Sequence, residues 1–153
     1  MFKCSTNMFL KNYRPLVMAH RGDSANIPEN TVQSFEDARK LKVDVIETDV
    51  HITKDNKFVL FHDKSVERTT NGQGLIADLT LAQLKQLDAG YQFQTPGEED
   101  YPFRGKGFRI HALEEILPLF PEVRFNALVN RRSKCGFGSQ IVTCAAGRSR
   151  CRF

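Results

Sequence analysis

The sequence predicts an α/β fold that opens with a β-α-β unit. Three observations support this class: a short apolar run at residues 16–19, apolar side chains at helical spacing over residues 30–41, and a return to strand character at residues 43–52. The first run is expected to be a buried strand. The two strands should lie parallel, because a crossover of this length permits a parallel return.

The helix of this unit is expected to begin at Asn30. Asn30 is a favourable N-cap residue, and Gln33 occupies the position that completes a capping box. Phe35, Ala38 and Leu41 recur at helical spacing. They are therefore expected to form the buried stripe of the helix.

A third strand at residues 58–61 follows too soon for another crossover. Residues 54–57 are polar and favour a tight turn, so this strand should form an antiparallel hairpin with the end of the preceding one. The hairpin would return His62 toward the strand that carries Glu47 and Asp49. Side chains that are far apart in the sequence could then converge.

The later elements are shorter. Thr80 and Gln83 resemble a capping box that opens a short helix. Its inward side chains are expected to be Leu81, Leu84 and Leu87. Residues 92–107 are rich in Gly, Pro and charge and predict a surface excursion. Residues 112–117 predict a second short helix, and residues 123–129 a further strand.

Length and composition favour a single soluble domain. The chain has 153 residues, of which 41% are hydrophobic and 26% charged. No apolar run approaches the roughly 20 residues that cross a bilayer, so no transmembrane segment is expected. Residues 1–14 lack the apolar core of a secretory signal, which predicts a cytoplasmic location.

The net charge of +4 is unevenly distributed. Residues 127–153 hold six basic residues and no acidic ones, whereas the preceding part holds 16 basic and 18 acidic residues. The main body is therefore mildly acidic, which argues against nucleic-acid binding. Three of the four cysteines also lie in this tail, at Cys135, Cys144 and Cys151. Their spacing matches no ordinary zinc site, so we expect unpaired thiols.

Candidate catalytic side chains lie on or just after the predicted strands. His20 and Arg21 follow the first strand, Glu47 and Asp49 lie on the second, and His62 follows the third. Two carboxylates at alternate strand positions face the same way and can hold a cation. An arginine can bind a phosphate, and two imidazoles can exchange protons near neutral pH. This combination predicts metal-assisted cleavage of a phosphodiester.

Six short motifs, in order, resemble the signature set of the glycerophosphodiester phosphodiesterase family. They are Ala19-His20-Arg21-Gly22, Pro28-Glu29-Asn30-Thr31, Glu47-Thr48-Asp49-Val50, His62-Asp63, Arg68-Thr69-Thr70-Asn71-Gly72 and Leu113-Glu114-Glu115-Ile116-Leu117. The resemblance implies a TIM-type (β/α) barrel of the phospholipase-C-like phosphodiesterase kind. It also implies that residues 73–108 are the small insertion of this family.

The resemblance further implies a reaction and a role for each candidate residue. The reaction is hydrolysis of a small glycerophosphodiester, such as glycerophosphocholine, to glycerol 3-phosphate and an alcohol, with Mg²⁺ or Ca²⁺ as the cation. By the resemblance, His20 and His62 would be the general acid and base, in an order left open. Glu47 and Asp49 would hold the metal, and Arg21 would bind a phosphate oxygen.

The resemblance stops after Asn126. The family continues with a strand similar to Asn-Ile-Glu-Ile-Lys, whose Glu completes the metal site and whose Lys faces the phosphate. Leu128 and Asn130 occupy those positions here. A full barrel needs about 250 residues. We therefore expect residues 1–126 to be the N-terminal part of a barrel that lacks its C-terminal half. Residues 127–153 are then an aberrant, disordered basic tail that arose by truncation or a frame shift.

Several interpretations follow from this departure. An enzyme with impaired activity is the first, and a non-catalytic remnant that binds a phosphate ligand or a partner is the second. A nucleic-acid binder that uses the basic tail is the third, although the tail lacks interleaved aromatic residues. An open barrel edge would also favour self-association, because it exposes apolar faces and unpaired backbone groups.

Overall fold

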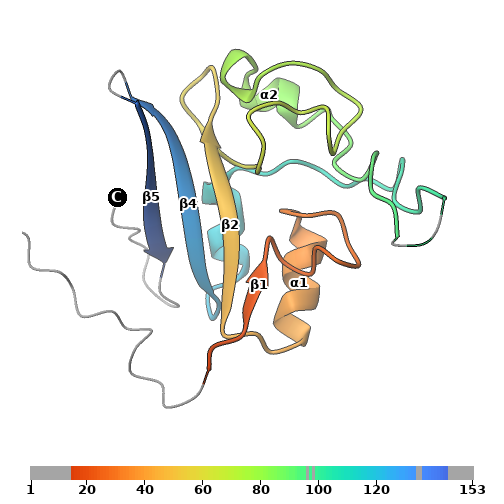
Figure 1. The fold of residues 1–153 in the computed structure, drawn as a ribbon, viewed down its shortest axis with the longest axis vertical. Coiled ribbons are helices and arrows are strands. Elements are labelled where there is room, and N and C mark those ends of the chain that lie inside the picture. The colour runs from red at the N-terminus through yellow and green to blue at the C-terminus, as the bar shows by residue number, and fades with distance from the viewer. Residues whose placement is uncertain (1–14, 96, 98, 134–135, 145–153) are drawn as a thin grey trace, which may run out of the picture.

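The computed structural model describes residues 15–95, 97, 99–133 and 136–144. A sheet of five strands lies at its centre, in the order β1-β2-β4-β5, with β3 paired to β2 off this path (Figure 1). The strands are β1 (Met18–His20), β2 (Val45–Ile52), β3 (Phe58–Leu60), β4 (Arg124–Ser133) and β5 (Gly136–Cys144). Strands β1, β2 and β4 are mutually parallel, whereas β3 and β5 run antiparallel to their partners. The α/β opening is thereby confirmed.

The crossover helix α1 (Val32–Lys40) begins one residue later than predicted. Thr31 is the N-cap: its hydroxyl accepts a hydrogen bond from the Ser34 amide, and the Ser34 hydroxyl accepts one from the Thr31 amide. Asn30 instead has a left-handed backbone with φ of 58°. An N-cap residue needs an extended backbone, so the predicted cap at Asn30 was wrong.

Two predictions of burial were also partly wrong. Phe35 and Ala38 are fully buried as expected, but Leu41 is exposed because it lies past the last helical residue, where the chain turns away. The first strand is not buried along its length, since Val17 and Met18 are exposed. Met18 lies on β1 and Val17 directly precedes it, and β1 is the outermost strand of the described sheet.

The predicted hairpin is confirmed. Strand β3 pairs antiparallel with the end of β2, with Val50 opposite Leu60. Asn56 takes the left-handed conformation in the turn, with φ of 58°. The Thr53 hydroxyl closes the turn by accepting a hydrogen bond from the Lys57 amide at 2.9 Å.

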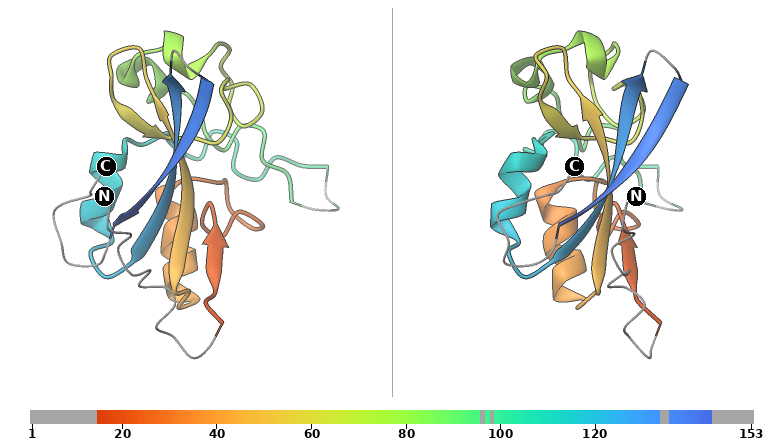
Figure 2. Two further views of the ribbon diagram at one scale, coloured as in Figure 1. Left: turned by 60° about the vertical axis from the view of Figure 1, so that its left-hand side comes forward. Right: turned by 90° about the vertical axis from the view of Figure 1, so that its left-hand side faces the viewer.

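Helices α1 and α3 (Leu113–Ile116) cover one face of the sheet (Figure 2). The short helix η3 (Leu117–Leu119) continues α3 through the predicted interruption at a proline. Phe35 packs edge-on against Phe120 and Phe125 between the helices and the sheet. Because side chains alternate along a strand, burial of Ile46 and Val50 in this core places Glu47 and Asp49 on the opposite face.

A second apolar cluster lies over β3. It is built by Val59, Phe61, Val66, Ile76, Leu84, Ala89, Phe108 and Ile110. The helices η2 (Ile76–Asp78) and α2 (Leu81–Leu84) contribute to it. The predicted capping box of Thr80 and Gln83 is confirmed, and all three predicted inward leucines pack in this cluster. The boundaries of the predicted insertion, residues 73–108, stay a prediction.

Residues 127–153 were expected to be disordered. The structure instead continues β4 to Ser133 and adds β5. Strand β4 extends because Ala127 and Val129 bury their side chains in the helix-covered core. Strand β5 is antiparallel, unlike the parallel repeat of a barrel. Cys4, Cys135 and Cys151 lie outside the described residues. Every helix within the described ranges lacks the length and apolar composition needed to cross a membrane.

Candidate active site

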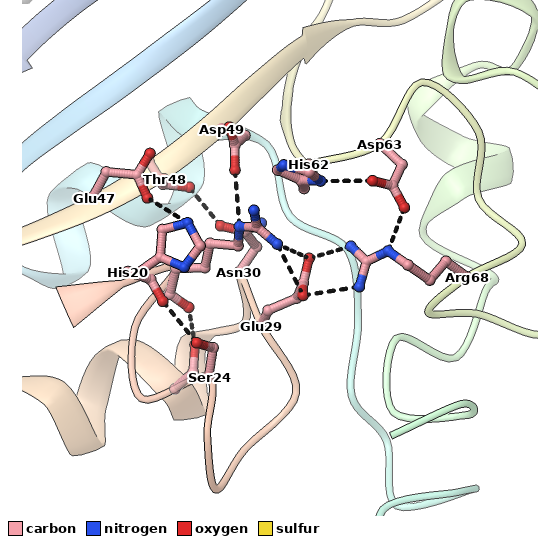
Figure 3. A network of polar contacts seen from close by, with 12 residues as sticks. His20, Ser24, Glu29, Asn30, Glu47, Thr48, Asp49, His62, Asp63 and Arg68 are labelled. Carbon is pink, nitrogen blue, oxygen red and sulfur yellow. Dashed lines mark hydrogen bonds and ion pairs between the residues drawn. The ribbon is translucent and has the colours of Figure 1, made fainter. Parts of the chain in front are cut away.

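His20 and Glu47 lie side by side at the ends of two parallel strands. His20 is the last residue of β1, and the register of the strands places it next to Glu47 on β2. The distance from His20 Nε2 to Glu47 Oε2 is 3.9 Å (Figure 3). The His20 side chain is largely exposed, whereas Glu47 is buried. The imidazole is therefore placed at the entrance to a buried carboxylate.

The turn after His20 directs Arg21 inward. Arg21 has φ of 59°, and its amide donates to the Glu47 carbonyl at 2.9 Å. Gly22 follows with φ of 82°, and a Cβ added there would lie 2.4 Å from Ser34 Oγ. The Ser34 hydroxyl donates to the Arg21 carbonyl. Glycine is thus required where the turn packs against α1, and the turn in turn fixes the position of Arg21.

The Arg21 guanidinium lies between two carboxylates. Its Nε is 3.2 Å from Asp49 Oδ2, and its Nη1 is 3.3 Å from both oxygens of Glu29. Glu29 belongs to the loop after β1, and Asp49 to β2. Arg21 is therefore oriented by charges on two separate segments.

Glu47 and Asp49 are both on the face of β2 opposite the helices, and only 7% and 6% of their surfaces are exposed. Burial raises the pKa of Glu47, and the nearby charge of Asp49 raises it further. The register places Asn126 of β4 next to Glu47. The two predicted metal ligands therefore share one face with a third oxygen-bearing side chain.

The buried side-chain nitrogen and oxygen atoms without a hydrogen-bond partner among the described residues all belong to this site. They are Arg21 Nε, Asn30 Nδ2, Glu47 Oε2, Asp49 Oδ2 and Asn126 Oδ1. Arg21 Nε and Asp49 Oδ2 face each other as an ion pair at 3.2 Å but form no hydrogen bond. Such atoms are rare in folded proteins because leaving them unpaired costs free energy. Their concentration at one place indicates that a ligand completes the site.

The oxygens that accept no hydrogen bond fit a divalent cation. Glu47, Asp49 and Asn126 each offer an oxygen atom, the ligand that Mg²⁺ and Ca²⁺ prefer. Leu128 lies next to Asp49 in the register, where the family pattern has a further carboxylate. The described residues contain no group of three or more His, Cys, Asp or Glu side chains that could hold a metal. Two carboxylates and one amide are thus the protein donors at this face.

His62 follows β3 and reaches the site from the hairpin. The Phe61 amide donates to the Asp49 carbonyl at 3.0 Å, which holds the end of β3 beside β2. Nδ1 of His62 is 2.6 Å from Asp63 Oδ1. His51 Nε2 is 2.9 Å from the carbonyl oxygen of His62. His51 follows Asp49 by two positions, so strand alternation could have identified it as a neighbour of the site.

Two further site residues, Glu29 and Arg68, received no role from the sequence. Arg68 contacts Glu29 through Nη2 at 2.6 Å and through Nη1 at 3.1 Å, and its Nε donates to Asp63. Burial alone would raise the pKa of Glu29, but the guanidinium groups of Arg68 and Arg21 outweigh it and lower that pKa. Glu29 and Arg68 lie in two of the recognised motifs. Their opposite charges were the only signal in the sequence that could have suggested an ion pair between them.

The five predicted site residues thus meet at one end of the sheet. His20 contacts Glu47, and Arg21 contacts Asp49. His62 joins them through Asp63, Arg68 and Glu29 (Figure 3). The arrangement combines two imidazoles, an oriented guanidinium and a face of unpaired oxygens. It is suited to bind a phosphate ester together with a cation and to move protons at it.

Comparison with known proteins identifies the same family that the sequence motifs resemble. A family model described as the glycerophosphoryl diester phosphodiesterase family matches residues 20–134. The curated glycerophosphodiester phosphodiesterase of Caldanaerobacter subterraneus subsp. tengcongensis is 47% identical over 123 residues, which cover 80% of this chain and 46% of that protein. The chain therefore spans about half the length of this curated relative.

Solved structures agree. The glycerophosphoryl diester phosphodiesterase domain of a Mycobacterium tuberculosis protein is 32% identical with a TM-score of 0.72, covering 75% of this chain and 43% of that one. An Oleispira antarctica phosphodiesterase in complex with the product sn-glycerol-3-phosphate is 35% identical with a TM-score of 0.62, covering 75% and 44%. These likenesses confirm the predicted fold class, a partial TIM-type barrel.

Proposed function

Because the chain belongs to the glycerophosphoryl diester phosphodiesterase family, we propose that its site hydrolyses glycerophosphodiesters to sn-glycerol 3-phosphate and an alcohol. One observation carries the proposal: buried oxygens of Glu47, Asp49 and Asn126 that accept no hydrogen bond from the described residues lie on one face, beside Arg21. The solved Oleispira antarctica relative holds sn-glycerol-3-phosphate as its product, which supports this choice of substrate class.

Two histidines would carry the proton transfers. Hydrolysis needs one group to take a proton from the nucleophile and another to give one to the leaving alcohol. His20 stands exposed at the entrance, and Nε2 of His62 has no hydrogen-bond partner among the described residues. Imidazole can take either role near pH 7, so the order of the two histidines stays open.

Charge neutralisation would be shared between Arg21 and a cation. Arg21 is held between Glu29 and Asp49, which pre-orients its guanidinium toward a phosphate oxygen. Glu47, Asp49 and Asn126 would hold Mg²⁺ or Ca²⁺. When bound, such a cation neutralises the charge of the diester and orients its phosphoryl group.

We also propose that activity is weak in this chain, because Leu128 lies beside Asp49 where the family pattern has a carboxylate. The same observation favours a second candidate function, namely non-catalytic binding of a phosphate ligand or partner through the same loops. Arg21 and the oxygen-lined face would support binding even where cleavage is lost.

One experiment separates these functions. The purified 153-residue chain would be incubated with glycerophosphocholine and Mg²⁺ or Ca²⁺, and release of sn-glycerol 3-phosphate measured. Catalysis predicts release that stops with EDTA and falls at least about 100-fold in His20→Asn and His62→Gln. His111→Asn is the control, because His111 pairs with Glu115 outside the site.

The second function predicts a different pattern. The wild-type chain would release no product, yet would bind sn-glycerol 3-phosphate in calorimetry, and Arg21→Met would abolish that binding. Absence of both turnover and binding would contradict both candidates. A cytoplasmic location and the absence of a nucleic-acid partner remain proposals that rest on the sequence alone.

A further inference from the structure

Alternating charges connect His62 to Arg21. Asp63 contacts His62, Arg68 contacts Asp63 and Glu29, and Glu29 contacts Arg21 (Figure 3). Glu29 and Arg68 are 39 residues apart in the sequence. They belong to the loops that follow β1 and β3, so Arg68 joins the loop that orients Arg21 to the loop that carries His62.

The contact with Asp63 determines which ring nitrogen of His62 carries the proton. Burial would raise the pKa of Asp63, but hydrogen bonds from Arg68 and His62 outweigh it and lower that pKa. Asp63 is therefore ionised near neutral pH, and an ionised carboxylate only accepts hydrogen bonds. Nδ1, at 2.6 Å, must donate. In the neutral ring, Nε2 then carries the lone pair.

The guanidinium of Arg68 can hold Asp63 in place in a way that a lysine ammonium cannot. Its Nε donates to Asp63 Oδ2, while Nη1 and Nη2 reach the two oxygens of Glu29. Three N–H groups in one plane hold two carboxylates at a fixed separation. A lysine has one nitrogen on a flexible stem and cannot reproduce this geometry. Asp63 would then be free to rotate away from Nδ1.

We propose that Arg68 is a positioning residue for His62: it holds Asp63 on Nδ1 and so presents Nε2 as the nitrogen that exchanges a proton with the substrate. The inference rests on the proposed role of His62 in acid–base chemistry. The competing interpretation is that Arg68 only ties two loops together and leaves the His62 tautomer unaffected.

The tautomer can be measured without any turnover. Long-range ¹⁵N–¹H correlation spectra of the full chain, above the titration range of imidazole, distinguish Nδ1–H from Nε2–H rings. The chain has four histidines, and His62→Gln identifies the signals of His62. The wild type is expected to show His62 as Nδ1–H. Arg68→Lys is expected to show a mixture of both tautomers.

Arg39→Lys is a matched control. Arg39 also pairs with a carboxylate distant in sequence, Glu122 at 3.3 Å, and its side chain is 49% exposed compared with 47% for Arg68. It lies on α1 away from the site, so its replacement should leave the His62 tautomer unchanged. An equal change in both lysine variants would overturn the proposal.

A second variant covers the case in which Arg68→Lys does not fold. Glu29→Gln leaves the contact of Arg68 with Asp63 but weakens the opposite anchor, so a smaller fraction of Nε2–H should appear. A wild-type ring protonated at Nε2, or a tautomer unaltered in every folded variant, overturns the proposal. If product release is observed, Arg68→Lys should also lower kcat about 100-fold with little change in KM. The spectra report the His62 tautomer without turnover, whereas the product-release assay reports the proposed function. The two can therefore fail independently.

Discussion

Leu128 lies next to Asp49 in the parallel register of β4 and β2. An apolar side chain thus adjoins a buried carboxylate whose Oδ2 is ion-paired with Arg21 but accepts no hydrogen bond from the described residues. One position earlier on this face, Asn126 adjoins Glu47 in the same way. Two carboxylates and an amide therefore share this face with a leucine, which would offer no ligand to the proposed cation.

Leu128→Glu should strengthen binding of Mg²⁺ or Ca²⁺ at least about ten-fold, because ligand charge count tunes the affinity of oxygen sites. Calorimetric titration of the chelator-treated chain would measure the change. Leu128→Gln is the matched control. Its side chain is similar in size to glutamate and offers an oxygen without a charge, so the gain in affinity should be smaller. Equal affinities of the two variants would contradict the placement of Leu128 at the cation site.

Gly22→Ala should destabilise the chain far more than a substitution at another glycine with positive φ. The new Cβ would meet the Ser34 backbone and side chain at 2.4 to 2.8 Å, whereas Gly105, at φ of 73°, has nothing within 4 Å of its Cβ position. Backbone strain alone should cost about 1 kcal/mol at Gly105. Gly22→Ala should cost at least about 2 kcal/mol more. Denaturant unfolding would measure both, and equal losses would refute the close packing.

Glu29→Gln should lower stability by about 1 to 3 kcal/mol at pH 7, since Glu29 accepts charged hydrogen bonds from two guanidiniums. The pKa of Glu29 is lowered in the folded chain because the two arginines outweigh the opposing effect of burial. Its contribution is therefore complete above the ordinary pKa of 4.5 and disappears as pH falls through the lower folded value.

Thermal unfolding at several pH values would test this dependence. The difference between the wild type and Glu29→Gln should shrink steadily below about pH 4. Glu122→Gln, which removes an exposed pair with Arg39, should change stability by less than about 0.5 kcal/mol throughout. A Glu29→Gln effect that persists unchanged at pH 2 would show that the carboxylate charge is not what stabilises the loop.

The apolar edge at β1 should make the chain self-associate. Val17 is 57% exposed and directly precedes β1, the outermost strand of the described sheet, and strand edges favour pairing with another chain. Sedimentation equilibrium should show a mass that rises with concentration, and Val17→Lys should reduce this rise. Leu119→Lys, at an equally exposed apolar residue on η3, is the control and should have little effect. A monomer at all concentrations would refute the prediction.

The parts of the fold that depend on local sequence could be predicted. The hairpin at residues 54–57, the Thr80 cap and the parallel β1–β2 unit all follow from periodicity and turn residues within short windows. The errors arose where tertiary context decides. Asn30 favours an N-cap by type, yet its backbone is left-handed, and its side chain instead accepts a hydrogen bond from Thr48.

The candidate site could also be predicted only in part from the sequence. His20, Arg21, Glu47, Asp49 and His62 were recognisable from residue type and motif, because each lies at or near a strand end. The link between Arg68 and Glu29 was not, because no local pattern reports a contact between loops 39 residues apart. Their meeting depends on the sheet register that sets the ends of β1 and β3 against β2.

The sequence by itself determined which chemical groups are available and the order of the elements that carry them, since both are written in short motifs. Only the tertiary structure decided which buried oxygens accept no hydrogen bond, that Leu128 borders Asp49, and how Arg68 joins His62 to the rest of the site. The reason is physical: burial, strand register and loop contacts arise when distant segments pack together, and no single segment contains that information.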